Sequence, residues 1–325
     1  MRRTRAQALP LVLLLVAISC ASAPNNLRQE PAKKLAGYQF DPNQPLVDRV
    51  QQAPDFLLRL LRTAGGLPSA APYLPSQDEK QLVQRYLELL PKSGLAVLDS
   101  RLIGIYFVNN LNGSGTTIRV YDNVDTVYAI ILMNPGMLHT NISDWLTYKE
   151  NSCFLSDQGN DRGIQVHMDC GTQYGGLLYA LLHETTHVLD YVYHYTPDTD
   201  SGSAPTPTPF TQGIWEKYDQ PTRAADFPLR DKVTFYHRDN GPKIHLSQAS
   251  RLYASLAQSP FASLYGSQNW LEDFAEFFTW YYYTTVLGQP FRITITRPGE
   301  PEITCEPMKS EAARRRAEAI TNMLH

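Results

Sequence analysis

The segment from Tyr174 to Tyr195 constrains the fold of this 325-residue chain more than any other. Its apolar residues recur at helical spacing, and it is the best-defined helix that the sequence predicts. The motif His183-Glu184-Thr-Thr-His187 interrupts this helix in its middle or later half. Any fold that the chain adopts therefore has to place these polar side chains on an otherwise apolar helix.

The two histidines of this motif have the spacing of metal ligands. Residues four apart lie on one face of a helix, so His183 and His187 can both direct a ring nitrogen at an ion about 2 Å away. Glu184 is rotated by roughly 100° from His183, where its carboxylate can take a proton from water and pass it to a leaving group. The alternative is a helix whose histidines form hydrogen bonds in the core. Because chance gives this motif with a probability of roughly 1%, we favour one Zn²⁺ ion per chain.

A catalytic zinc site needs a third protein ligand and an open fourth position. Glu272 and Glu276 are again four residues apart, in a strongly apolar segment that Asn269 or Ser267 can cap as a helix. Carboxylates buried in such a segment are unfavourable unless a positive charge compensates them, and a zinc ion would do so. We expect Glu272 to be the ligand, with Glu276 as its competitor. The alternative is a solvated acidic face, which fits Asp273 better.

The two motifs together resemble the gluzincin metallopeptidases. The downstream pattern, from Asn269 through Glu272 to Glu276, is similar to that in the catalytic domain of anthrax lethal factor and in the Pro-Pro endopeptidases. The resemblance implies a zincin-like fold and a zinc-dependent peptidase, with Glu272 completing the metal site and Glu184 as general base. It also assigns Tyr265, seven residues before Glu272, as the hydrogen-bond donor to the oxyanion.

Two further acidic residues follow from the same resemblance. Glu276 matches a carboxylate that lies beyond the metal ligands, and Asp190 matches an acidic residue just past the histidine motif. We expect both to orient ligand histidines through their free ring nitrogens. For Asp190, a plain charge on the helix surface is an equal alternative.

The N-terminus predicts export. Three arginines precede an apolar run over residues 9–18, and small residues follow, which is the layout of a secretory signal. The run is too short to span a bilayer as a helix. Residues 17–20 resemble a bacterial lipobox, in which Cys20 is lipidated, while cleavage after residue 23 is the alternative. We therefore predict a signal peptide over 1–19 and an exported, membrane-anchored lipoprotein that faces the periplasm or the cell surface.

Export places the remaining cysteines in an oxidising compartment. Cys153 and Cys170 flank a short polar segment, so a disulfide between them is the simplest pairing and leaves Cys305 over. The alternative is that all three are small buried hydrophobes. The sequence contains no C-x-x-C pair, so nothing in it supports a cysteine-based metal site.

The remaining pattern favours an α+β protein. Residues 20–36 are predicted as a tether, and residues 37–325 as one zincin-like domain. This domain is expected to be mainly helical, with a helical N-terminal part over about 37–95 and a small mixed sheet beside the motif helix. Residues 196–213 are rich in Pro, Thr and Ser and predict a loop. The other predicted elements are helices over 46–61 (interrupted at Pro54), 77–90, 247–258, 268–286 and 311–324, and strands over 101–108, 116–122, 126–134, 163–169 and 291–296.

The sequence thus predicts a zinc peptidase of the bacterial cell envelope that acts on a peptide or protein substrate. Its net charge of −3 gives no basic field for nucleic acid. Two alternatives stay open: a non-catalytic envelope lipoprotein with a zincin fold, and a zinc amidase or endopeptidase that acts on peptidoglycan peptides.

Overall fold

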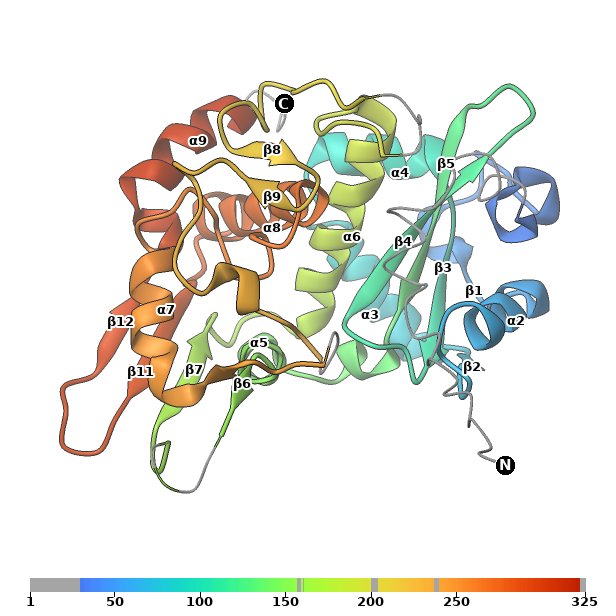
Figure 1. The fold of residues 1–325 in the computed structure, drawn as a ribbon. Helices are drawn as coiled ribbons and strands as arrows, with labels where there is room; N and C mark the ends of the chain where they lie inside the picture. The colour runs from blue at the N-terminus through green and yellow to red at the C-terminus, as the bar shows by residue number, and fades with distance from the viewer. Residues whose placement is uncertain (1–29, 157–158, 160, 200–203, 237–239, 322–325) are drawn as a thin grey trace, which may run out of the picture.

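A mixed sheet forms the N-terminal half of the molecule (Figure 1). The structure is a computed structural model that describes residues 30–321 except 157–158, 160, 200–203 and 237–239, so the predicted signal peptide and Cys20 lie outside it. The strands of the sheet are β1 (Val50–Gln51), β2 (Ala71–Tyr73), β3 (Leu102–Asn109), β4 (Gly115–Tyr121) and β5 (Val127–Met133). Their order is β1-β3-β5-β4, with β2 antiparallel to β3; β3 is parallel to β1 and β5, whereas β4 is antiparallel to β5.

Alternation along the strands buries both faces of this sheet. In β5, Ile131 faces one hydrophobic cluster and Ile130 faces another. The first cluster includes the apolar residues of α6 (Gly176–Tyr193), and the second includes those of α2 (Asp55–Thr63). Figure 1 shows these helices on opposite sides of the sheet. The motif helix α6 is therefore a central layer, covered by the sheet on one side and by the C-terminal half on the other.

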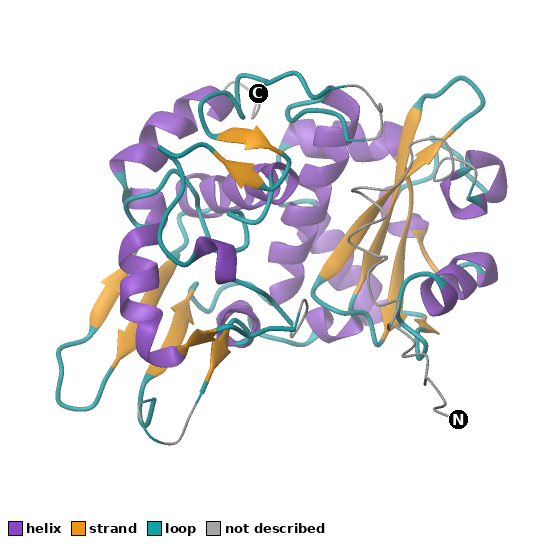
Figure 2. Cartoon of the chain, viewed as in Figure 1, coloured by secondary structure: helices purple, strands orange, loops and turns teal. Residues whose placement is uncertain are grey.

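The C-terminal half packs around α8 (Trp270–Tyr281), which lies against α6 (Figure 2). A three-stranded antiparallel sheet of order β12-β11-β7 lies below it. The strands of this sheet are β7 (Gln165–Asp169), β11 (Arg292–Thr296) and β12 (Ile303–Cys305), and the other helices of this half are α5 (Ile142–Asn151), α7 (Ala249–Leu256) and α9 (Glu311–Thr321). Two short strand pairs complete this half: β6 (Phe154–Leu155) pairs with β10 (Ile244–His245), and β8 (Trp215–Lys217) pairs with β9 (Gln220–Pro221). Helices and small sheets are mixed without regular alternation, which agrees with the predicted α+β class.

Most of the predicted elements are present, with small shifts of their ends. The helix predicted over 77–90 is α3 (Gln77–Leu87), and Ser76 and Glu79 form the capping box at its start. The helix predicted over 46–61 is wrong in its first part, because Leu46–Arg49 is a 3-10 turn and α2 begins only after Pro54. Residues 196–213 form no helix or strand where they are described, as predicted for a loop.

One helix was missed at the start of the strand region. Lys92–Arg101 is a helix, α4, that packs on α6. Gly94 allows this close approach, since a Cβ there would lie 3.0 Å from a methyl carbon of Thr185 in the metal motif. A glycine inside a helical stretch lowers helix propensity, and the sequence alone does not show that close packing requires it.

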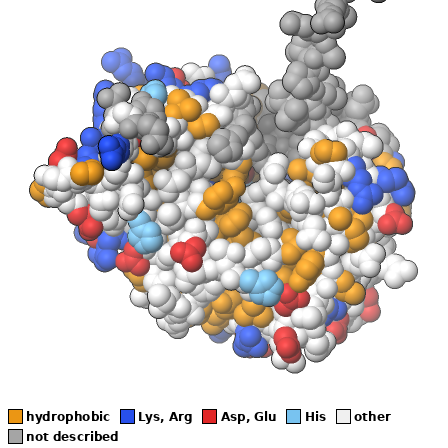
Figure 3. All heavy atoms as spheres, turned by 90° about the horizontal axis from the view of Figure 1, so that it is seen from below, with side chains coloured by type: hydrophobic (Ala, Val, Ile, Leu, Met, Phe, Trp, Pro, Cys, Tyr) orange, Lys and Arg blue, Asp and Glu red, His pale blue; other side chains and the backbone are white. Residues whose placement is uncertain are grey.

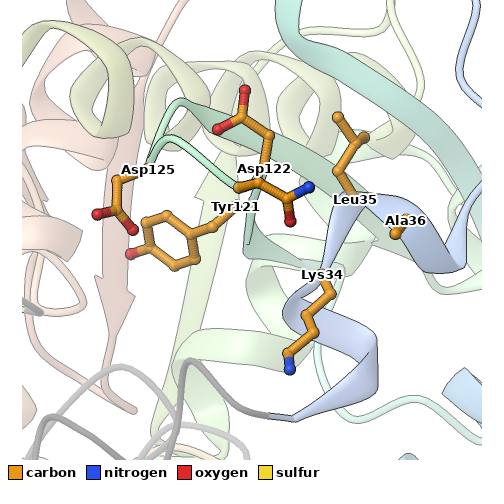
Figure 4. Close-up of a pocket in the computed structure, with 7 residues that line it drawn as sticks. Lys34, Leu35, Ala36, Tyr121, Asp122 and Asp125 are labelled. Atoms are coloured by element: carbon orange, nitrogen blue, oxygen red, sulfur yellow. The ribbon is translucent and has the colours of Figure 1, made fainter.

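The predicted tether is too long. Pro31–Lys33 and Leu35–Gly37 are 3-10 turns, Ala32 and Lys33 are buried, and Lys34 forms a bridge with Tyr121 at the end of β4. A pocket of about 230 Å³ lies between these turns and the hairpin after β4 (Figure 4). The chain therefore packs against the fold from about residue 31. The part predicted as helical, 37–95, also contains the strands β1 and β2.

Figure 3 shows the molecule from the end that carries α5 and the β6–β7 connection. Apolar side chains gather in a band across the middle of this face, and acidic and basic side chains are interspersed around it. The face carries no field of a single sign. Among the described residues, no helix combines the length and the apolar character that crossing a membrane requires.

Candidate metal centre

The histidine motif lies in a buried stretch of α6. His183, Glu184 and His187 are 4%, 2% and 7% exposed. The helix begins after Gly175, whose N–H donates to the hydroxyl of Tyr86, and ends where His194 takes a left-handed conformation. This core position is the one that the apolar flanks of the motif predict.

Glu272 reaches the two histidines from α8. Asn269 caps that helix by accepting from the N–H groups of Leu271 and Glu272, which sets Glu272 in the first turn. Its Oε2 lies 3.1 Å from Nε2 of His183 and 3.6 Å from Nε2 of His187. These three ligand atoms lie within 4.8 Å of one another, so the group could hold a metal ion.

The charges of this group depend on one another. Burial opposes the charged form of His183, but contacts with Glu272 and Glu276 outweigh it and raise the pKa of His183 to about 10. Burial alone would raise the pKa of Glu272, yet the two histidines lower it well below its usual range. Without a metal, the group therefore pairs an imidazolium with a carboxylate, and a bound cation would take the place of the proton.

Glu276 lies on the other side of His183 from Glu272. Its Oε1 is 3.2 Å from Nδ1 of His183, within ion-pair distance but outside the direction of a hydrogen bond. It is absent from the group that could hold a metal, which favours Glu272 as the ligand. Burial would raise the pKa of Glu276, but Lys149 and His183 lower it well below its usual range.

The edge strand β4 fixes the side chain of Glu184. The hydroxyl of Thr117 donates to Oε2 at 2.7 Å, and Gly115 leaves space for the other oxygen, since a Cβ there would lie 3.0 Å from Oε1. Burial raises the pKa of Glu184, while the two histidines and Thr117 act in the opposite direction. Neither Gly115 nor Thr117 was predicted as a site residue, because the alternation of a strand does not show which of its two faces packs against α6.

Tyr265 lies beside the site, as the resemblance implies. Its partly buried ring has its centroid 6.0 Å from that of the His183 imidazole, and Phe235 meets it edge-on at 5.1 Å. Behind the ring lies Lys149, a buried lysine of α5 whose Nζ is 3.9 Å from the Tyr265 ring centroid. No sequence pattern points to Lys149, which lies in a helix that was not predicted.

Asp190 has neither of its two predicted roles. Its carboxylate accepts from the N–H and the hydroxyl of Thr196, at 2.7 and 2.6 Å, and is only 3% exposed. It is therefore not a surface charge, and its hydrogen bonds go to the start of the 196–213 loop rather than to a histidine. The same loop is held to β4 by Arg119, which donates to Asp198 at 2.8 Å.

Asp273 is buried, which corrects its assignment to a solvated face. It is 0% exposed and pairs with Arg316 of α9, whose Nη1 lies 2.8 Å from its Oδ1. The indole N–H of Trp215 donates to its other oxygen at 2.7 Å. The sequence could not show this pairing, because it joins residues from two distant helices.

The predicted Cys153–Cys170 disulfide is absent. Both residues and Cys305 are free and buried, and burial raises the pKa of all three thiols. Cys153 and Cys170 belong to the large hydrophobic cluster, where they pack as small apolar side chains. The backbone of Cys170 is held on both sides: its N–H donates to the hydroxyl of Ser143, and its carbonyl accepts from the hydroxyl of Tyr283.

Glu150, next to Lys149, is the basis of a prediction on pH. Burial raises its pKa to about 7, against a hydrogen bond from Tyr253 that lowers it. Between about pH 4.5 and about pH 7 the folded protein therefore keeps a proton on Glu150 that the unfolded chain releases. The free energy of unfolding falls over this range as the pH rises, by about 3 kcal/mol in total. Glu150→Gln should gain that amount relative to wild type between pH 4.5 and about pH 8 in urea unfolding. The exposed Glu88→Gln is the control, and a pH-independent difference for Glu150→Gln would contradict the assignment.

No protein-family model, no curated protein and no solved structure matches the chain.

Proposed function

We propose that the chain is a zinc-dependent peptidase of the bacterial cell envelope. One observation supports a metal site: Oε2 of Glu272 lies 3.1 and 3.6 Å from the two histidine nitrogens. Two atoms bound to zinc at about 2.1 Å with tetrahedral geometry are about 3.4 Å apart. Two imidazoles and one carboxylate are also the ligand set of a catalytic zinc site with its fourth position open. His183, His187 and Glu272 would hold the ion.

The other side chains have distinct roles in this proposal. A bound zinc ion would polarise the scissile carbonyl and make water more acidic. Glu184, held by Thr117, accepts the proton of the attacking water and later gives it to the leaving amine. Tyr265 donates a hydrogen bond to the oxygen that becomes negative in the tetrahedral state. A carboxyl with a raised pKa suits the two steps of Glu184, since it must both take and release a proton.

The position of β4 supports a peptide as substrate. It is an edge strand; among the described residues its outer side forms a strand bridge only at Tyr121, with Lys34, and the carbonyl of Thr117 accepts from the hydroxyl of Tyr191 at 3.5 Å. An extended peptide can add to such an edge through backbone hydrogen bonds. Because Gly115 and Thr117 of this strand contact Glu184, a peptide on the edge would pass next to the general base.

The envelope location rests on the N-terminal sequence. A lipid on Cys20 would anchor the protein to a membrane facing the periplasm or the cell surface. The membrane and a peptide or protein substrate are the partners in this proposal.

The test is metal analysis followed by a cleavage profile. We expect the purified protein to bind one zinc ion per chain and to cleave members of a mixed peptide library, with activity lost to a chelator and restored by zinc. Purified peptidoglycan is assayed in parallel. Release of muropeptides without library cleavage would favour the cell-wall alternative, and zinc binding without any hydrolysis would favour the non-catalytic one. A protein that binds no zinc contradicts the site assignment.

A further inference from the structure

Lys149 is a buried cation that lies behind the candidate site. It is 2% exposed, and its Nζ lies 2.5 Å from the hydroxyl oxygen of Tyr179 and 3.2 Å from Oε1 of Glu276. The nearest aromatic ring is that of Tyr265, with Nζ 3.9 Å from its centroid, while the rings of Tyr179 and Phe235 lie farther away, at 5.0 and 5.8 Å. Burying an ammonium group is strongly unfavourable unless its surroundings compensate the charge, so these contacts define what the residue does.

Glu276 does not need Lys149 to complete its hydrogen bonds. Its Oε1 accepts from the hydroxyl of Tyr179, and its Oε2 accepts from Ser263 at 2.6 Å and from the indole of Trp280 at 2.9 Å. Lys149 adds a positive charge to a carboxylate that neutral donors already hold in place. The neutralisation of Glu276 therefore explains why the lysine can be buried, but not why its ammonium lies over an aromatic ring.

The contact with Tyr265 has two physical effects. A cation over the face of an aromatic ring is attracted to it, and the attraction is stronger when both are shielded from water. Lys149 on one side and the edge-on ring of Phe235 therefore restrict the orientation of Tyr265. The positive charge also draws the electrons of the Tyr265 O–H bond toward the oxygen. In a low-dielectric site this makes the hydroxyl a stronger hydrogen-bond donor.

We propose that Lys149 is a positioning residue that fixes the Tyr265 ring and strengthens its hydroxyl as the donor to the oxyanion. This inference rests on the proposed peptidase function. Tyr265 touches the substrate, and Lys149 acts through it. The charge of Lys149 therefore matters only while the Tyr265 hydroxyl is present.

A double-mutant cycle tests this dependence. Lys149→Gln keeps an N–H donor near Glu276 but has no charge, so we expect kcat to fall about tenfold while KM changes less than about twofold. In a Tyr265→Phe background, which keeps the ring and lacks the hydroxyl, the same change should alter kcat less than about twofold. Lys149→Arg keeps the charge and should retain most of kcat. Equal losses in both backgrounds would overturn the inference, because Lys149 would then act through Glu276 or the fold.

A binding measurement gives the second readout. The probe is a phosphinic pseudopeptide, built on the best library substrate, whose charged oxygen imitates the oxyanion. The dissociation constants are measured by calorimetry on zinc-loaded Glu184→Gln protein. Adding Lys149→Gln should raise the dissociation constant of this probe about tenfold and that of the matching amide peptide less than about twofold. Equal weakening of both would contradict the proposal.

Controls separate the possible failures. Lys309→Gln removes an exposed lysine and should change neither measurement. If Lys149→Gln does not fold, Lys149→Gln combined with Glu276→Gln replaces it, because this pair buries no unpaired charge, and its effect on kcat is compared in the Tyr265 and Tyr265→Phe backgrounds. A wild-type protein that hydrolyses no peptide refutes the proposed function itself, and this result is seen before any Lys149 variant is made.

Discussion

Replacing Glu184 with glutamine is expected to leave the metal site intact and to abolish peptide hydrolysis. The amide has the shape of the carboxylate, and its oxygen can accept from Thr117 as Oε2 does at 2.7 Å. It cannot take a proton from water, so kcat should fall by about 10³-fold or more. The zinc content, measured by metal analysis, should stay at one ion per chain.

Two comparisons make this result specific. Glu88→Gln changes an exposed glutamate in the same way and should keep full activity. Thermal unfolding of Glu184→Gln should match wild type or exceed it, since the variant no longer buries a carboxyl group whose charged form is unfavourable. If Glu184→Gln retains most of the wild-type kcat, Glu184 is not the general base.

Replacing Glu272 with glutamine is expected to remove the effect of zinc on stability. A ligand that binds only the folded state stabilises it by about 4 kcal/mol when present at about a thousand times its dissociation constant. We therefore expect zinc to raise the unfolding temperature of the wild type clearly. An amide is a poor zinc ligand, so Glu272→Gln should lose most of this shift and all measurable activity.

Glu276→Gln is the matched comparison for this experiment. It lies on the same helix and also contacts His183, but from the Nδ1 side. Loss of a carboxylate that supports a ligand histidine typically lowers metal affinity by about 10- to 100-fold, so a zinc shift should remain at high zinc concentration. A shift that survives in Glu272→Gln and disappears in Glu276→Gln would reverse the roles of the two glutamates.

The parts of the site that the sequence could predict are those that depend on local spacing. Helical periodicity placed His183 and His187 on one face, and the Asn269 cap with an apolar segment placed Glu272 on a second helix. The resemblance supplied Tyr265, which no local rule would have selected from nineteen tyrosines. The assignments of His183, His187 and Glu272 agree with the geometry because each of these residues lies within a helix that its own motif predicts.

The parts that could not be predicted depend on contacts between distant elements. Thr117 meets Glu184 only because β4 is the edge strand beside α6, and an alternating strand does not specify its neighbours. Lys149 lies on a helix that the pattern missed, and its burial depends on Glu276 of another helix. The same reason explains the wrong assignments of Asp273 and of the Cys153–Cys170 pair.

The pairing of Asp273 with Arg316 links the metal ligand to the order in which the chain is made. Asp273 is the residue after Glu272, and its buried charge is compensated by a helix that is synthesised some forty positions later. A nascent chain without α9 carries both proposed metal-binding motifs, but it has an uncompensated carboxylate next to Glu272. In the proposed function, peptidase activity therefore depends on docking of the C-terminal helix, which is the last part of the described chain to be synthesised.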